Sequence, residues 1–209
     1  LAPTVSWYPE KVYYNVYDVT SLINNKENLL AVKLGNGRYF GMRQSDTQVF
    51  GLPRLLAQLN IEYTDGSTDV VISDESWKVT SNGAIVANNE FDGEEYDAII
   101  GWDGWNWKGF DDSNWKQVDI MSNPGGKLVA QPNPNIRVQE EITPISITAH
   151  TDGKYILDMG QNMVGWIKIN SLKGVKDKPI TMRFAETLKD DGSLYMDNLM
   201  GAKVTDIYT

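Results

Sequence analysis

Apolar and polar side chains alternate along much of the chain, a pattern typical of β-strands that pack one face against a core. The longest alternation spans residues 55–63, and the residues on its apolar face are Leu55, Ala57, Leu59, Ile61 and Tyr63. It leads into Asp65-Gly66 and then into a second β-rich run, Thr68–Ile72. Because Asp-Gly supplies the positive φ angles of a tight turn, the two runs predict a β-hairpin.

Further short strands follow the same pattern, separated by turn signals such as Asp152-Gly153 and Asp190-Asp191-Gly192. The predicted strands are Leu29–Leu34, Ile145–Ala149, Lys154–Asp158, Val164–Asn170, Pro179–Ala185 and Ala202–Tyr208. Only Asp18–Asn24 predicts a single helical turn, because no stretch keeps a helical period over the roughly ten residues of an ordinary helix. The sequence therefore predicts an all-β fold and disfavours parallel α/β folds.

A change of composition between residues 123 and 135 predicts a domain boundary. The stretch is rich in proline, glycine and asparagine, and proline removes the N–H donors that a central strand needs. We expect two antiparallel β-sandwich domains, residues 1–132 and 135–209. The second lies near the lower size limit for a self-sufficient core, so we expect it to lean on a neighbour and to continue beyond this chain.

Composition and charge exclude several classes of partner. Hydrophobic residues make up 41% of the 209 residues and charged residues 22%, which predicts a packed core rather than disorder. The net charge of −9 repels phosphate backbones and anionic lipid, so we expect neither nucleic acid nor a membrane surface as a partner. No apolar run reaches the ~18–20 residues of a membrane span.

The absence of cysteine excludes disulfides, thiolate nucleophiles and cysteine-based zinc sites. It does not decide the compartment, because a domain with a large core needs no disulfide, and a periplasmic or extracellular parent protein stays open. The chain begins at Leu1, with neither an initiator methionine nor a signal-peptide pattern, so we expect a piece of something longer.

Two familiar kinds of site find little support in the residues. His150 is the only histidine and stands before the turn Thr151–Gly153, so a Ser-His-Asp triad or a multi-histidine metal site is not expected. The glycines Gly35 and Gly37 are not followed by the Gly-Lys-Ser/Thr ending of a phosphate loop, and a tight exit from a strand explains them.

Pairs of acidic residues offer a candidate for glycoside hydrolysis, which uses two carboxyl groups about 5–9.5 Å apart. Side chains two positions apart on a strand point the same way, so Glu95 with Asp97, or Asp92 with Glu94, meets this requirement. Acidic residues are common in a chain of this charge, however. We therefore assign no catalytic residue and rank a structural role first.

Asn88, Asn89, Asp92 and Glu94 form an oxygen-rich group that is a candidate calcium site. Calcium takes about six to eight oxygens from carboxylates, amides and carbonyls. The spacing lacks the Asp-x-Asp-x-Asp-Gly pattern, so an ordinary loop is the alternative. Calcium is the one cofactor that these residues suggest. Asp190–Ser193 is a similar oxygen-rich group, but a hairpin turn explains it.

The segment 102–110 has the least ordinary composition, with the three indoles of Trp102, Trp105 and Trp107 among glycine, asparagine and aspartate. An indole face can stack on the C–H face of a sugar while polar neighbours bind its hydroxyls. These tryptophans, with Asn89 and Asp92, are therefore candidate carbohydrate-binding residues. The alternative, which we rank first, is that the indoles anchor a long loop to a sandwich.

The first two thirds of the chain resembles the N-terminal jelly-roll domain of the bacterial α-L-rhamnosidases, a domain of the sugar-binding type. The segments that carry the resemblance are Tyr17–Leu22, Glu27–Val32, Leu34–Tyr39, Asp74–Val79, Asp92–Ala98 and Gly109–Trp115. Strings like the last one also occur in jelly rolls of other glycoside hydrolases. Relative to this pattern, the start of the domain is missing.

The last third is similar to the next domain of the same family, a concanavalin-like β-domain. The segments that carry this resemblance are Asp158–Trp166, Arg183–Glu186, Asp191–Tyr195 and Asn198–Asp206. The first of these is the family's most specific motif here.

The resemblance implies an accessory role and a carbohydrate partner containing L-rhamnose. Family members continue into an (α/α)₆ barrel that carries the acid and base carboxylates of an inverting mechanism, and nothing here resembles that barrel. We thus expect a non-catalytic region that braces the barrel of a parent glycosidase and is inactive alone. In some relatives the first domain binds L-rhamnose through calcium and a stacking tryptophan, so the alternative is a calcium-assisted carbohydrate-binding module.

Overall fold

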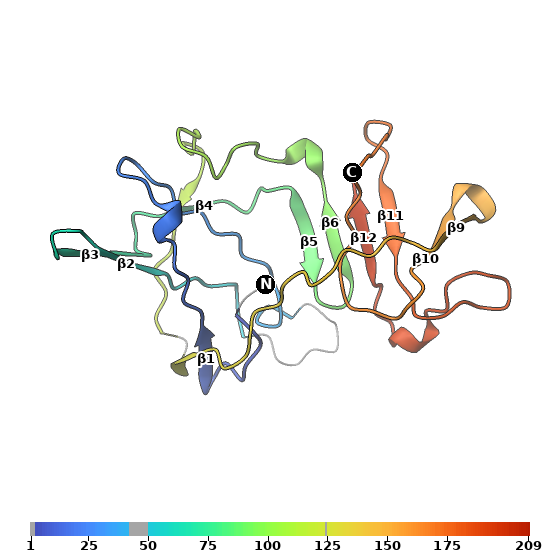
Figure 1. Cartoon of the computed structure of the whole chain (residues 1–209), viewed down its shortest axis with the longest axis horizontal. Helices are drawn as coiled ribbons and strands as arrows, with labels where there is room; N and C mark the ends of the chain where they lie inside the picture. Colours follow the sequence, from blue (N-terminus) through green and yellow to red (C-terminus); the bar gives the residue numbers. More distant parts are fainter. Residues whose placement is uncertain (1–2, 42–49, 124) are drawn as a thin grey trace.

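In the computed structural model, which describes residues 3–41, 50–123 and 125–209, short β-strands are joined by long irregular connections (Figure 1). The strands are β1 (Lys11–Tyr14), β2 (Gln58–Glu62), β3 (Thr68–Ile72), β4 (Lys78–Val79), β5 (Ile85–Asn89), β6 (Gly93–Tyr96), β7 (Lys116–Gln117), β8 (Lys127–Ala130), β9 (Ser146–Ala149), β10 (Tyr155–Asp158), β11 (Ile180–Arg183) and β12 (Thr205–Tyr208). Helical structure in these residues is limited to four 3₁₀ turns, η1 (Thr20–Leu22), η2 (Ala98–Ile100), η3 (Thr151–Gly153) and η4 (Asp197–Leu199). The predicted all-β fold is confirmed.

The described residues hold no helix with the length and apolar character needed to cross a membrane. The single helical turn predicted within Asp18–Asn24 is present as η1. The Asp18 carboxylate accepts the N–H of Thr20 at 2.9 Å, which fixes the chain just before the turn.

The predicted hairpin is formed by β2 and β3, which pair antiparallel with Gln58 opposite Ile72. Gly66 takes a φ of +83° in the turn, a conformation that a Cβ atom disfavours. The Asp65 carboxylate accepts the N–H and the hydroxyl of Ser67 at 2.9 and 2.6 Å. Local turn chemistry therefore fixes the register of this pair.

The other predicted strands divide into two groups. Strands β9 to β12 fall within four of the predicted ranges. Leu29–Leu34 and Val164–Asn170, in contrast, do not form strands in the structure. An extended segment becomes a strand only when a neighbour accepts and donates its backbone hydrogen bonds, and no described segment pairs with these two.

The largest sheet has the order β11-β12-β6-β5 and combines strands that are far apart in the sequence (Figure 1). β5 and β6 form an antiparallel hairpin, and β11 pairs antiparallel with β12 across a long connection that contains η4. β12 lies parallel to β6, so that Ile207 pairs with Glu95 and Tyr208 with Tyr96. The sheet thus contains residues from both sides of the predicted boundary.

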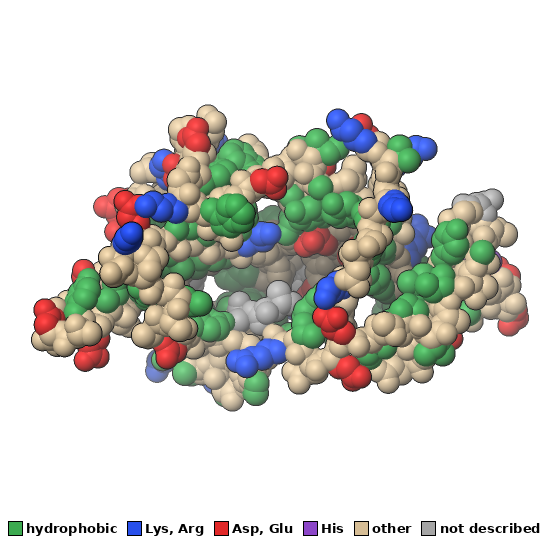
Figure 2. Space-filling view, turned by 45° about the horizontal axis from the view of Figure 1, so that its top comes forward, with side chains coloured by type: hydrophobic (Ala, Val, Ile, Leu, Met, Phe, Trp, Pro, Cys, Tyr) green, Lys and Arg blue, Asp and Glu red, His purple; other side chains and the backbone are tan. Residues whose placement is uncertain are grey.

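The apolar side chains do not close into a core. None of the described hydrophobic residues is buried, and the chain exposes 17131 Å², whereas a compact monomer of 23.5 kDa exposes about 10,000 Å². Figure 2 shows hydrophobic side chains exposed over much of the face in view, interspersed with charged ones. The expectation of a packed core is therefore wrong for the described residues, because every one of their hydrophobic side chains stays at least partly exposed.

Candidate functional site

Trp102 belongs to a cluster of three aromatic rings that holds the segment 102–110 in place. Its ring centroid lies 5.7 Å from that of Phe110 and 5.9 Å from that of Trp115, the latter edge to face. The indole N–H of Trp102 donates to the carbonyl oxygen of Asn82. The indole nitrogen of Trp115 is buried without a hydrogen-bond partner. Contacts of this kind are those of a loop anchor.

Trp105 and Trp107 differ in what they present to solvent. The ammonium group of Lys33 lies 5.8 Å from the centroid of the Trp105 ring, a cation–π contact. The Trp107 side chain is exposed, with 72% of its surface accessible. Of the three predicted indoles, Trp107 therefore offers the most open ring face to a ligand.

Asn89 is the last residue of β5, and Asp92 lies in the turn that leads to β6. The Asn89 side-chain oxygen accepts the N–H groups of Phe91 and Asp92 at 2.9 and 2.7 Å, and its amide donates to the Asp92 carboxylate at 3.0 Å. Asn88 is bound differently: its side-chain oxygen accepts the N–H of Asn36 at 3.0 Å. The structure thus brings Asn89 and Asp92 together as a capped turn.

This turn and the tryptophan segment lie at opposite ends of β6 (Figure 1). The turn precedes β6, whereas the segment 102–110 follows it and η2. The predicted carbohydrate residues Trp102, Trp105 and Trp107 therefore form one group, and Asn89 and Asp92 another.

The β5–β6 turn is also the junction with the C-terminal segment. The Asp92 carboxylate accepts the N–H of Lys203 at 3.1 Å, and its carbonyl oxygen accepts the N–H of Thr205 at 2.8 Å. The Asp206 carboxylate accepts the N–H of Glu94 at 2.8 Å. Asp92, just before β6, and Asp206, on β12, thus each accept hydrogen bonds from the opposite segment and hold the two strands together.

These bonds bear on the candidate calcium site of Asn88, Asn89, Asp92 and Glu94. No group of three or more histidine, aspartate or glutamate side chains suited to a metal ion occurs in the described residues. The oxygens of Asn89 and Asp92 already accept backbone or amide N–H groups. A calcium ion here would have to share those oxygens, and calcium at this quartet stays a prediction.

The acidic pairs proposed for hydrolysis occupy structural positions. The Asp97 carboxylate accepts the N–H of Ile99 at 2.8 Å and caps η2. Glu95 stands on β6 between Ala87 and Ile207 of the neighbouring strands. A carboxylate that caps a helical turn is held by that bond rather than poised for proton transfer.

Five exposed aspartates share one local motif, in which the carboxylate accepts hydrogen bonds from a serine or threonine two positions later. The side-chain hydrogen bond, assisted by the backbone N–H, lowers the pKa of each carboxyl below its ordinary value. The aspartates are Asp18, Asp65, Asp74, Asp111 and Asp191. Asp191 belongs to the predicted hairpin turn Asp190–Ser193. The isolated antiparallel bridge between Leu188 and Leu194 confirms that turn.

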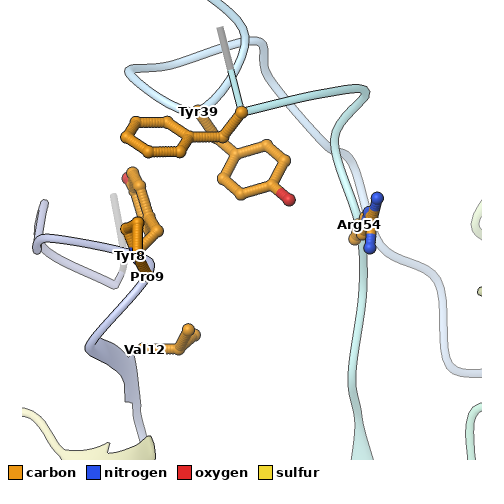
Figure 3. A pocket seen from close by; sticks show the side chains of 6 residues that line it. Tyr8, Pro9, Val12, Tyr39 and Arg54 are labelled. Atoms are coloured by element: carbon orange, nitrogen blue, oxygen red, sulfur yellow. The ribbon is translucent and has the colours of Figure 1, made fainter. Parts of the chain in front are cut away.

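A pocket that the sequence pattern does not reveal lies beside β1 (Figure 3). Its volume is about 150 Å³, and the lining residues are Tyr8, Pro9, Val12, Tyr39, Phe50 and Arg54. These residues come from three separate stretches of the chain, so no local spacing could have identified them.

Two family models match the chain. Residues 1–140 match the α-L-rhamnosidase N-terminal domain, and residues 148–209 match the bacterial α-L-rhamnosidase concanavalin-like domain. Together they cover nearly all of the sequence.

Curated relatives agree with these models. The α-L-rhamnosidase of Streptomyces avermitilis is 37% identical over 216 residues, covering 100% of this chain and 20% of that protein. The α-L-rhamnosidase of Alteromonas sp. (strain LOR) is 36% identical over 211 residues, covering 100% of this chain and 23% of that protein. The chain therefore spans about a fifth of the length of these relatives.

Solved structures show the same likeness. The α-L-rhamnosidase from Dictyoglumus thermophilum superposes on the whole chain with a TM-score of 0.86 at 37% identity, using 23% of its own length. The Streptomyces avermitilis enzyme, solved in complex with L-rhamnose, gives a TM-score of 0.85 at 35% identity over 20% of its length. Fold and sequence agree over the entire chain, which thus belongs to the α-L-rhamnosidase family and corresponds to its N-terminal and concanavalin-like domains.

Proposed function

We propose that the chain is a non-catalytic accessory region of a longer α-L-rhamnosidase, and that its open interior packs against the (α/α)₆ catalytic barrel of the parent protein. One observation carries the proposal: the chain exposes 17131 Å² and holds no buried hydrophobic residue among those described. This is about 7,000 Å² more than a compact monomer of the same mass exposes.

The size of this excess favours an intramolecular partner. A standard interface between two proteins buries about 1,600 Å² in total, and large permanent interfaces bury about 2,000–5,000 Å². The most exposed apolar side chains are scattered over the whole chain, and they include Val16, Leu22, Leu52, Leu56, Val164 and Met200. A surface of this extent and distribution fits further parts of the same polypeptide better than one transient partner.

The junction between β6 and β12 supports a bracing role. Two hydrogen-bonded aspartates and a parallel strand pair fix the C-terminal segment to the β5–β6 hairpin. A bracing domain must keep its own parts fixed relative to one another, and the hydrogen bonds of this junction support that requirement.

Two measurements test the accessory role. With an aryl α-L-rhamnoside as substrate, the chain alone should give no turnover; hydrolysis that disappears in Glu95→Gln would overturn the proposal. When the rest of the parent protein is supplied as a separate polypeptide, the fluorescence of a bound hydrophobic dye should fall as the apolar faces are covered. Unchanged dye fluorescence in a demonstrated complex would also contradict it.

A calcium-assisted carbohydrate-binding module is the second candidate, because Trp107 presents an open indole. Calorimetry with L-rhamnose, in the presence and absence of a chelator, tests it. Trp107→Ala should abolish the binding heat, whereas Trp166→Ala, which removes another exposed indole, should not. Flat traces for the unmodified chain would leave the accessory role as the sole account.

A further inference from the structure

The pocket beside β1 has one apolar side and one cationic side. Tyr8 and Val12 lie on the side of β1, and Arg54 lies across the open space from them (Figure 3). The hydroxyl end of Tyr39 points into the space between (Figure 3). A ligand that fills the pocket thus meets aromatic carbon at one end and a guanidinium at the other.

The aromatic side is held rigidly by mutual ring contacts. Tyr8 packs edge to face on Tyr39 and on Phe50, with centroid distances of 5.1 and 5.3 Å. The N–H of Phe50 donates to the carbonyl oxygen of Tyr39 at 3.1 Å. A preformed aromatic wall binds a ring with little loss of side-chain freedom.

Arg54 supplies donors that its present contact does not use. One of its amino groups donates to the Ser122 carbonyl oxygen at 3.3 Å, a long bond. The guanidinium carries about five N–H donors in a planar fork that matches a carboxylate. No described carboxylate forms an ion pair with it.

The size of the pocket suits a small ligand. A Cβ atom placed on Gly51 would lie 3.7 Å from an Arg54 amino nitrogen and 3.8 Å from a Tyr39 ring carbon, so both groups border the same space. Engineered apolar cavities of about 150 Å³ hold one benzene ring. The pocket, also about 150 Å³, therefore has room for one six-membered ring.

We propose that this pocket binds a single six-membered ring that carries a carboxylate, with the ring against Tyr8, Tyr39 and Val12 and the carboxylate on Arg54. Burial, followed by the nearby Glu90 carboxylate, raises the pKa of Tyr8, whereas Arg38, the ion-pair partner of Glu90, lowers it. The Tyr8 phenol is therefore neutral, and the negative charge closest to it, on Glu90, is paired with Arg38. Two sources share this chemistry, a hexuronate sugar and an aromatic carboxylate. The inference does not depend on the accessory role proposed above.

Titration of the ¹⁵N-labelled chain with galacturonate and with 4-hydroxybenzoate tests the site by NMR. At least one should shift the amides around Tyr39 and Arg54, with a Kd on the order of 1 mM for so small a ligand. Which of the two binds identifies the source. Galactose, which lacks the carboxylate, should bind at least about tenfold more weakly.

Variants connect the signal to the pocket. Arg54→Gln should weaken binding about tenfold, and Val12→Phe should fill the space and abolish it. Arg137→Gln, which removes the same charge outside the pocket, should leave the affinity unchanged. Intact β2–β3 hairpin resonances verify that each variant folds. Absence of binding by both acids, equal binding of galactose, or full affinity in Arg54→Gln would overturn the inference.

Discussion

The rings of Tyr96 on β6 and Tyr208 on β12 stack in parallel, with centroids 5.6 Å apart and planes 4° from parallel. The two residues are also register partners in the parallel strand pair. Backbone hydrogen bonds continue the pairing beyond this register pair, since Ala98 N–H donates to the Thr209 carbonyl oxygen and Thr209 N–H donates to the Tyr96 carbonyl oxygen. The stack therefore reports directly on whether the C-terminal strand is seated.

Removing the stack should loosen β12. We expect Tyr208→Ala to lower the free energy of unfolding by about 1–2 kcal/mol, because it loses ring contact as well as partial burial. Chemical denaturation followed by tyrosine fluorescence measures the change. Tyr155→Ala on β10, where the ring is mostly exposed, serves as the control and should cost less. Equal losses in the two variants would show that the stack contributes nothing.

Gly93 should tolerate no side chain. Its φ is +105°, and a Cβ atom would lie 2.1 Å from the Thr205 carbonyl oxygen, inside the β6–β12 junction. Gly93→Ala should cost on the order of 3 kcal/mol or more through strain and overlap. Gly109→Ala separates these effects, because its φ is +82° but the space around it is open, so strain alone should cost about 1–2 kcal/mol. A similar cost at both positions would contradict crowding at Gly93.

The Asp206 carboxylate should matter through its bond to the Glu94 N–H. Asp206→Ala leaves that donor without its partner and should destabilise the junction by about 1–2 kcal/mol, while Asp206→Asn keeps an acceptor oxygen and should cost less. Amide hydrogen exchange at Glu94 measures the local effect. Asp103→Ala, an exposed aspartate in the tryptophan segment, is the control. Unchanged protection of Glu94 in Asp206→Ala would refute the assignment.

Acid should weaken the serine-capped turns. Their carboxyls have lower pKa values in the folded chain than the ordinary value of about 3.9 that they take when unfolded. The unfolded state thus binds protons first, so the stabilisation is present above pH ~4 and disappears as pH falls through the lower folded values. In an NMR titration, Ser67→Ala should raise the pKa of Asp65 toward its ordinary value. Ser81→Ala should leave it in place; the opposite pattern would rule out the Ser67 bond as the cause.

Local patterns in the sequence predict local structure here and little else. The β2–β3 hairpin follows from alternation and one Asp-Gly turn, which act over a few residues. The pairing of β6 with β12 escapes prediction, because a parallel pair requires a long crossover and leaves no local signal. Val164–Asn170 has the composition of a strand but no neighbour among the described residues, so it remains unpaired.

The candidate site shows the same division. Asn89 and Asp92 are close in sequence and meet in one turn, as their spacing indicates. Trp102 turns toward Phe110 and Trp115, a choice made by packing that composition does not encode. The expectation of a closed core fails for a related reason. Composition gives the number of apolar side chains, but their burial depends on which segments pack against them, and composition does not determine that.

The sheet β11-β12-β6-β5 has a practical consequence for anyone who cuts this polypeptide. A truncation in the proline-rich stretch 123–135 would strip β12 from β6 and leave the hairpin with a bare edge, the kind of edge on which strands of other molecules assemble. A chimera that takes the residues on one side of this stretch from a relative would have to preserve the pairing of β6 with β12. Both halves are therefore best expressed together, as one polypeptide.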